Sequence, residues 1–327
     1  MKHISIVVPS GEFVLGSVEG PFKLFSQVNA FLQDKGRSDA FRIDLVGISK
    51  EASINGGLFR LQMTKTIDDK FDTDLIIIPA PHGDIPESIR LNSKFLPWIV
   101  EKYKSGAEVA SLCMGAFLLA STGLLDGKKC ATHWIAADEL RRAFPRVNVV
   151  AEKVITDEHG IYSSGGAYSY LNLILYLIEK YTGRDMAVLI AKVFEIEIDR
   201  GSQSQFIIFR GQKSHDDIPI RKAQEYIEQN YQQKITIDQL ASMFALSRRN
   251  LERRFKKATS NTAVEYIQRV KIEAAKNSLE SSRENVNEVM YKVGYSDSKA
   301  FRDTFKKLTG LSPLQYRLKY NREAAAI

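Results

Sequence analysis

The chain has 327 residues, of which 44% are hydrophobic and 26% charged, a composition typical of a globular protein with room for two domains. Its two cysteines, Cys113 and Cys130, are too few for a disulfide scaffold and indicate a reducing, cytoplasmic setting. The formal net charge of +7 lies entirely in residues 215–327, which hold 21 Lys and Arg against 14 Asp and Glu, whereas residues 1–214 hold 25 of each.

The first two hundred residues alternate short apolar runs with amphipathic patterns. The runs HISIVVP, FRIDLVGI, DLIIIPA, AEVASLC and VNVVAEK are nearly continuous in apolar residues, as buried parallel strands are. Helical spacing lies between or after them in FKLFSQVNAFLQDKG, SKFLPWIVEKYKSG, GAFLLASTGLLDG and GGAYSYLNLILYLIEKYTG, the last ending at Gly183. This alternation predicts an α/β domain, a flavodoxin-like parallel sheet with helices on both faces.

One position in this region points to chemistry. In SLCMGAFLLA, Cys113 lies between an apolar strand and a helix that begins near Gly115. A sharp strand-to-helix turn would expose the thiol at the carboxyl edge of the sheet, where helix amides stabilise an anion and lower a thiol pKa. The alternative is a small buried hydrophobic residue at a strand end. Because the apolar stretch 109–125 contains Ser, Thr and Gly and a turn, no membrane partner is expected.

The same region resembles the PfpI-type, class I glutamine amidotransferase-like domain. The resemblance rests on the segments SLCMGAFLLASTGLLDGKKCATHW, PAPHGD, GPFKLF and SSGGAYSYLNLILYLIE. It implies that the elbow cysteine corresponds to a nucleophile that a histidine and an acidic residue support in that superfamily.

Several residues depart from the pattern of that superfamily. Met114 stands where the protease branch has His, Ser17 stands at the position of the supporting acid, and residues 79–83 replace a glycine-rich oxyanion loop. His82 and His133 are candidate bases, and Glu12 or Glu19 could supply a shifted acid. We interpret the domain as a ligand pocket on an enzyme scaffold that has lost catalysis, with no catalytic residue, metal or cofactor. The expected ligand-binding residues are Ser17, His82, Gly83, Cys113, Met114, Gly115 and His133.

The predicted domains are residues 1–210 and 218–327. The polar, aperiodic segment GQKSHDD at residues 211–217 is the expected linker.

The last hundred residues contain an internal repeat of roughly 50 residues. The two copies are TIDQLASMFALSRRNLERRFKKAT and NVNEVMYKVGYSDSKAFRDTFKKLTG, and the anchors Leu251 and Phe255 correspond to Phe301 and Phe305. Each copy predicts a helix-turn-helix whose second helix buries these anchors and exposes a basic face suited to a DNA major groove. The alternative for either helix alone is an ordinary solvated face. The exposed residues expected at DNA are Arg248, Arg249, Glu252, Arg253 and Lys256 in the first copy and Ser298, Lys299, Arg302 and Lys306 in the second.

A helix over TAVEYIQRVKIEAAKNSLES should space the two copies rigidly. Its expected inward residues are Val264, Ile267, Val270, Ala274 and Leu279. Gly294 lies where the turn of the second copy favours a positive φ, and the first copy has Ala245 there.

This region closely resembles the AraC/XylS-type DNA-binding domain in LSRRNLERRF, VGYSDSKAFRDTF and TGLSPLQYR, which occur in the right order and spacing. The resemblance implies two recognition helices in successive major grooves, with base-reading positions at Arg249, Glu252, Arg253, Ser298, Lys299 and Arg302. Asp303 replaces a common Arg, Met290 replaces the usual Ala, and TSNTAVEY lacks the usual Gly and Pro. We therefore expect residues 247–257 to provide most of the base readout.

The two resemblances together give the arrangement of the GlxA-type AraC regulators. They imply a cytoplasmic transcription factor that senses a small-molecule effector, binds double-stranded promoter DNA as a homodimer, and contacts RNA polymerase if it activates. One alternative is a Cys-dependent hydrolase or amidase of the PfpI type with an accessory DNA-binding domain. Another is a nucleoid-type binder without sequence preference.

Overall fold

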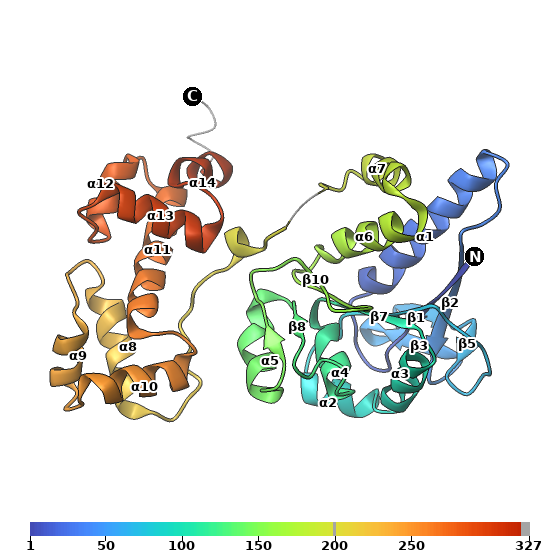
Figure 1. Cartoon of the computed structure of the whole chain (residues 1–327), viewed down its shortest axis with the longest axis horizontal. Coiled ribbons are helices and arrows are strands. Elements are labelled where there is room, and N and C mark those ends of the chain that lie inside the picture. The colour runs from blue at the N-terminus through green and yellow to red at the C-terminus, as the bar shows by residue number, and fades with distance from the viewer. Residues whose placement is uncertain (199–200, 322–327) are drawn as a thin grey trace. The chain divides into compact units, whose positions relative to one another are not determined.

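The computed structural model describes residues 1–198 and 201–321, which form two compact units, Met1–Gln203 and Ser204–Ile327 (Figure 1). The division after Gln203 precedes the predicted domain limit at residue 210. In the predicted linker, Asp217 already caps the first long helix of the second unit, because its side chain accepts a hydrogen bond from Ile220 N. Residues 199–200 and 322–327, which belong to the predicted domains, lie outside the described part of the chain.

The first unit is built on a seven-stranded sheet with the order β10-β11-β7-β6-β1-β2-β5. Neighbouring strands are parallel except β10, which runs antiparallel to β11. The predicted flavodoxin-like sheet is confirmed. Its strands are β1 (Lys2–Val7), β2 (Phe41–Gly47), β5 (Lys65–Thr66), β6 (Leu75–Ile78), β7 (Glu108–Leu112), β10 (Ile155–Asp157) and β11 (Ile161–Ser164).

Helices cover both faces of this sheet (Figure 1). One face carries α1 (Gly16–Asp34), α6 (Tyr170–Thr182) and α7 (Arg184–Val193). The other carries α2 (Ile85–Leu91), α3 (Phe95–Lys104), the short α4 (Ala116–Ser121) and α5 (Ala137–Ala143). Alternate residues of β6 enter the two resulting cores, Leu75 and Ile77 on one side and Ile76 and Ile78 on the other. A strand buried on both faces has to be apolar throughout, which is why the sequence pattern identified it.

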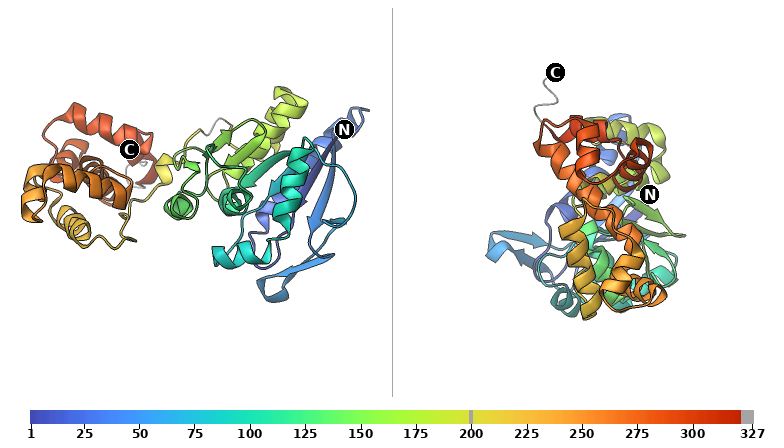
Figure 2. Two further views of the ribbon diagram at one scale, coloured as in Figure 1. Left: turned by 60° about the horizontal axis from the view of Figure 1, so that its bottom comes forward. Right: turned by 90° about the vertical axis from the view of Figure 1, so that its left-hand side faces the viewer.

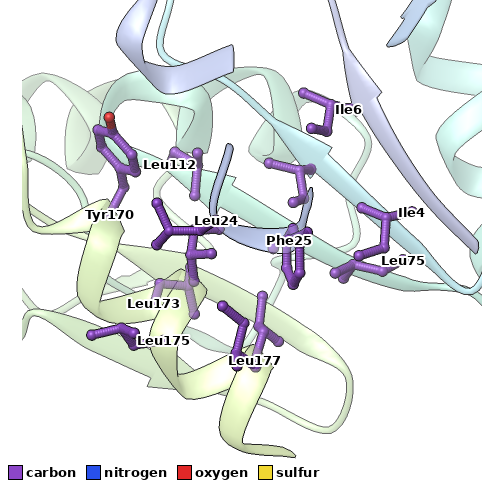
Figure 3. Packing of buried hydrophobic residues seen from close by; sticks show 14 of the residues in the cluster. Ile4, Ile6, Leu24, Phe25, Leu75, Leu112, Tyr170, Leu173, Leu175 and Leu177 are labelled. Atoms are coloured by element: carbon purple, nitrogen blue, oxygen red, sulfur yellow. The ribbon is translucent and has the colours of Figure 1, made fainter. Parts of the chain in front are cut away.

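The core on the α1 and α6 face is shown in Figure 3. Leu24 and Phe25 of α1 and Leu173 of α6 belong to one apolar cluster with Ile4 and Ile6 of β1, between the helices and the sheet. All five side chains are buried, so helix and strand spacing converge on one contiguous apolar layer.

The predicted strand VNVVAEK is wrong in its extent. Only β9 (Asn148–Val149) forms there, and it pairs with β8 (Lys129–Cys130) outside the main sheet. The strand that lies beside β7 is instead β11, whose serines, Ser163 and Ser164, are fully buried. The strand prediction relies on nearly continuous apolar runs. The two serines interrupt such a run, and for this reason the sequence pattern does not identify β11.

A second small sheet is the hairpin of β3 (Glu51–Ile54) and β4 (Phe59–Gln62), joined by the 3-10 turn η1 (Asn55–Gly57) and projecting from the body of the unit (Figure 2). Across the described residues, no helix combines the length and apolar character that crossing a bilayer requires.

The second unit is helical, as predicted. After the 3-10 turn η4 (Ser204–Phe206) come α8 (Ile218–Asn230), α9 (Ile237–Met243), α10 (Arg248–Thr259), α11 (Ala263–Ser281), α12 (Val286–Lys292), α13 (Ser298–Thr309) and α14 (Pro313–Tyr320). It contains two cores, one around α8, α9 and α10 and one around α12, α13 and α14, and α11 contributes to both. On α11, Ile267 and Leu279 are buried as expected, but Val264, the second residue of the helix, is half exposed because its side chain lies on the face turned away from the core that Ala263 and Ile267 enter.

Candidate ligand site and nucleic-acid interface

Cys113 occupies a sharp turn between β7 and α4, as the sequence predicts. Its backbone is left-handed, with φ 54°, and it opens the short 3-10 turn η2 (Cys113–Gly115). Gly115 packs so closely on the end of β6 that a Cβ there would lie 2.5 Å from the carbonyl oxygen of Ile78. A left-handed cysteine is strained, and it persists because tight packing on both sides fixes the turn.

The thiol itself is not the activated anion that the turn suggested. Cys113 is only 6% exposed, and burial raises its pKa to about 11, although a backbone hydrogen bond from Met114 acts in the opposite direction. The expectation of a lowered thiol pKa is therefore wrong. Desolvation outweighs the helix amides, so the group is a neutral thiol at pH 7.

Neither candidate base engages Cys113. His133 Nδ1 accepts a hydrogen bond from Ile135 N at 3.2 Å, its ring lies beside Trp134, and burial lowers the pKa of the imidazole. His82 is exposed, and its backbone N–H donates to Glu12 O. Among residues 1–198 and 201–321, no hydrogen bond joins the Cys113 thiol to a histidine.

Ser17, at the position of the expected acid, has a structural partner. It lies in the first turn of α1, is 1% exposed, and its hydroxyl donates to Val14 O at 2.6 Å. The same oxygen accepts from Ala80 N at 3.0 Å. The hydroxyl thus occupies a backbone N–H of the loop at residues 79–83, which stands in place of the glycine-rich oxyanion loop. Glu12, a candidate for a shifted acid, accepts instead from Asn55 N of the β3–β4 hairpin at 3.0 Å.

A pocket of about 400 Å³ lies elsewhere in this unit, between α6, α7 and the residues around β10. Its lining mixes apolar and polar side chains, and it contains none of the seven ligand residues predicted from sequence. A pocket formed by helix packing leaves no motif in the sequence, and so nothing marked these residues in advance. They are Lys153, Ile155, Asn172, Leu175, Tyr176, Glu179, Arg184, Ala187, Ile198 and Gly201.

In the second unit, α9 and α10 form the first helix-turn-helix. Thr236 starts α9 with a capping box that includes Gln239, and Ser247 starts α10 by accepting a hydrogen bond from Asn250 N. Leu251 and Phe255 are fully buried, so α10 turns its basic face outward. Between the helices Ala245 is left-handed, with φ 53°.

The second helix-turn-helix, α12 and α13, repeats this arrangement. Asn285 and Asp297 cap the two helices, and Phe301 and Phe305 are buried where the first copy has Leu251 and Phe255. Gly294 takes the left-handed turn position, with φ 76°. The predicted internal repeat is confirmed, and buried and exposed positions of α10 and α13 follow the same order from 251–260 and from 301–310.

Polar contacts inside the unit repeat as well. Thr259 Oγ1 donates to Phe255 O at 2.8 Å, and Thr309 Oγ1 donates to Phe305 O at 2.8 Å, which closes the end of each second helix in the same way. Tyr266 and Tyr316 each donate to a glutamate of the preceding long helix. The repeat is therefore one structural module used twice, with α11 ending the first copy and beginning the second.

The predicted DNA residues lie on the exposed faces of α10 and α13 but differ in their local partners. On α10, Arg248 lies within 3.4 Å of Asp238 and Glu252, and Arg253 donates to Asn250 Oδ1 at 3.0 Å. Lys256 donates to Ser260 O at 2.8 Å. Within the described ranges, the side chains of Arg249, Lys299, Arg302 and Lys306 have no ion-pair partner, so four cations face solvent unpaired.

Two family profiles match the chain, the DJ-1/PfpI family over residues 24–180 and a helix-turn-helix domain over residues 240–319. Similar proteins are the HTH-type transcriptional regulators GbdR and ArgR of Pseudomonas aeruginosa, which are 28% and 26% identical over 65% of this chain. GlxA of Rhizobium meliloti, also named an HTH-type transcriptional regulator, is 26% identical over 64%. The alignments span 58%, 65% and 64% of those three proteins, less than two thirds of each.

Solved structures agree with the fold of the first unit. A transcriptional regulator protein from Vibrio parahaemolyticus, described as putative, superposes with a TM-score of 0.52 and 23% identity, covering 59% of this chain and 98% of that one. A THiJ/PfpI family protein from Pseudomonas syringae superposes with a TM-score of 0.50 and 17% identity, covering 75% and 90%. At these identities the likeness supports the fold alone.

Proposed function

We propose that this chain, which joins a DJ-1/PfpI domain to a C-terminal helix-turn-helix domain of the AraC type, is a sequence-specific DNA-binding transcriptional regulator. The observation that carries the proposal is the duplicated helix-turn-helix, whose two second helices bury equivalent residues and expose basic faces. Arg249 and Arg253 of α10 can contact guanine in a bidentate manner, and the lysines of both helices suit phosphates.

The second helices of the two copies, α10 and α13, are called the reading helices below. They would occupy successive major grooves on one face of the DNA, about 34 Å apart. A homodimer would double the DNA contacted, and the proteins similar to this chain are named as transcriptional regulators, which supports a promoter as the target. In a regulator that activates transcription, RNA polymerase would be a further partner.

Genomic mapping of the binding sites, followed by competition binding at fixed salt, tests this function. A specific regulator should prefer its mapped site over unrelated DNA by ~10³-fold or more. Equal affinity for all sequences would instead identify the nucleoid-type alternative, in which only phosphates are contacted.

The second part of the proposal is that the first unit binds a small-molecule effector without catalysis, at the carboxyl edge of the sheet around Cys113. Three observations support a non-catalytic site: the neutral buried thiol, the lack of a thiol–imidazole hydrogen bond among the described residues, and the engagement of Ala80 N by Ser17. The effector would act by binding one DNA-binding state of the protein more tightly than another. The proposed contacts are Ser17, His82, Gly83, Cys113, Met114, Gly115 and His133.

Promoter activity of Cys113→Ala in the presence of effector tests the role of the thiol. We expect regulation to persist, because the proposed contact of Cys113 with the effector is the packing of a neutral thiol, which the alanine side chain partly retains, and involves no covalent bond. Cys130→Ala is the matched control, since Cys130 is the other buried cysteine and lies in β8, outside the elbow turn. Loss of regulation in Cys113→Ala alone would contradict the proposal and assign the thiol a direct role.

The left-handed backbone at Cys113 favours one alternative function, a Cys-dependent hydrolase or amidase. That enzyme would need a base that reaches the thiol once substrate binds. Hydrolysis of small amides or esters by the full chain that Cys113→Ala abolishes would establish it.

A further inference from the structure

Lys271 is a buried lysine on α11, the helix that belongs to both helix-turn-helix copies. Its side chain is 8% exposed, and no carboxylate within the described ranges lies at ion-pair distance. Burial lowers the pKa of its ammonium group. A charge in such a place is costly unless hydrogen bonds compensate, so its partners indicate what it does.

The partners of Lys271 come from two different copies of the module. Its Nζ donates to Gly294 O at 2.9 Å, in the turn between α12 and α13, and to Gln233 O at 3.4 Å, in the connection between α8 and α9. Nζ also lies 5.5 Å from the ring centroid of Tyr295, which packs edge-on against Phe301 of α13. One ammonium group therefore links the first copy to the turn that carries the second reading helix.

The two copies touch directly at this point. A Cβ at Gly294 would lie 2.1 Å from Gln232 O, so the α12–α13 turn packs against the α8–α9 connection with no room for a side chain. Tyr231, from the same connection, packs against the apolar core of the second copy. The contact is compact, and without Lys271 two carbonyl oxygens would remain there with no charged donor.

We propose that Lys271 is a positioning residue that fixes the second reading helix relative to the first and thereby sets the spacing of the two DNA segments that the chain accepts. This inference rests on the proposed DNA-binding function. Helix α11 keeps the copies at one distance along its axis, and each copy packs on it through its own apolar core, so a pivot of the second copy about α11 is opposed by apolar contacts on the helix itself. The Lys271 contacts restrain this pivot because they lie off the axis, at the turn next to α13.

The experiment compares Lys271→Met with Lys276→Met in the full chain. Lys276 is the matched control, because it is also buried on α11, at 4% exposure, but its Nζ donates to Ile207 O and Glu273 and touches neither turn. Affinity is measured for the mapped site and for the same site with one base pair inserted or removed between the two segments. The affinity of wild type and of Lys276→Met should be lower on the order of tenfold for the altered sites than for the mapped site. The affinity of Lys271→Met should be lower by about threefold or less.

Amide hydrogen exchange of the free protein supplies a second readout. Lys271→Met should accelerate exchange in residues 292–296 and 231–234, and Lys276→Met should leave those segments unchanged. If Lys271→Met loses helical signal, Lys271→Gln, which keeps N–H donors on a shorter chain, takes its place in both measurements.

If Lys271→Met loses as much affinity as wild type does when one base pair is inserted or removed, the inference is wrong. If wild type shows no sequence preference at all, the proposed function fails, and hydrogen exchange alone then decides whether Lys271 couples the copies.

Discussion

The reading helices α10 and α13 have the same buried side and different exposed sides. Both end on a threonine that hydrogen bonds back into the helix, and both place large apolar anchors against their own core. On the exposed side the charges differ: Arg253 of α10 corresponds to Asp303 of α13, and Glu252 corresponds to Arg302. Packing dictates the buried positions, whereas the exposed positions are free to follow whatever the helix contacts.

The largest expected effects test whether the two cores are equivalent. Phe255→Ala and Phe305→Ala should each lower the free energy of unfolding by about 3–5 kcal/mol, because each removes a fully buried ring. Helical circular dichroism at 222 nm during denaturation measures the loss. Both tryptophans, Trp98 and Trp134, lie in the first unit, so their fluorescence reports the stability of that unit and should not change. Values that differ greatly between the two variants would contradict equivalent cores.

DNA affinity should separate the two helices. Arg253→Ala should cost about 1–3 kcal/mol on the mapped site if Arg253 reads a base. Asp303→Ala should weaken binding little or tighten it, because the carboxylate repels phosphate. Electrophoretic mobility shifts or fluorescence anisotropy at fixed salt measure both variants. An equal loss of Arg253→Ala on unrelated DNA would mark Arg253 as a phosphate contact instead.

An ion pair that α13 lacks gives α10 a contribution to stability that depends on pH. Arg254 donates twice to Asp217, which lowers the pKa of that carboxyl below its usual 3.8, whereas α13 has Thr304 at the equivalent place. A carboxyl whose folded pKa is depressed contributes stability above its unfolded pKa, and the contribution disappears as pH falls through the folded pKa. Asp217→Asn, which keeps the helix cap, should therefore lower stability by about 1 kcal/mol at pH 7 and by progressively less below pH ~3.8. Denaturant unfolding at pH 7 and pH 3 would show this, and a constant difference would contradict it.

The smallest expected effect lies in the turns. Ala245 holds the left-handed conformation that Gly294 adopts without strain, so Ala245→Gly should raise the free energy of unfolding by about 0.5 kcal/mol, after the greater freedom of glycine in the unfolded chain is subtracted. Thermal denaturation followed at 222 nm would detect it. A lower melting temperature would mean that unfolded-state entropy outweighs the relief of strain.

The sequence predicted most of the fold wherever burial leaves a periodic pattern. The run Leu75–Ile78 identified a central strand, and the anchors of α10 and α13 identified both helices and their exposed faces. Ser163 and Ser164 conceal an interior strand. Ser163 Oγ accepts from Ala131 N at 2.7 Å, a contact that only the folded chain provides, whereas the buried Ser164 hydroxyl has no hydrogen-bond partner among the described residues. Polar residues with tertiary partners carry no periodic signal.

The candidate ligand site was harder to predict than the reading helices. The sharp strand-to-helix turn at Cys113 followed from the local sequence, but its left-handed backbone did not, and the state of its thiol depends on burial by residues distant in the chain. The partner of Ser17 is Ala80, and no local pattern relates them. Lys271 gave no signal either, since a lysine on an amphipathic helix is ordinarily solvated and its carbonyl partners become adjacent only in the folded unit.

Because α10 and α13 have the same buried side, the exposed face of one can be transferred to the other without changing the core. Transferring the five α10 residues expected at DNA to α13 takes four substitutions, Ser298→Arg, Lys299→Arg, Arg302→Glu and Asp303→Arg, because Lys306 already matches Lys256; none of these positions contributes to the apolar core. The grafted protein would present one reading surface twice, in the same orientation along the module. Selection from random oligonucleotides should then recover a tandem direct repeat. The DNA sequence preferred by each half of the binding site could thus be changed separately, by substitutions in one reading helix.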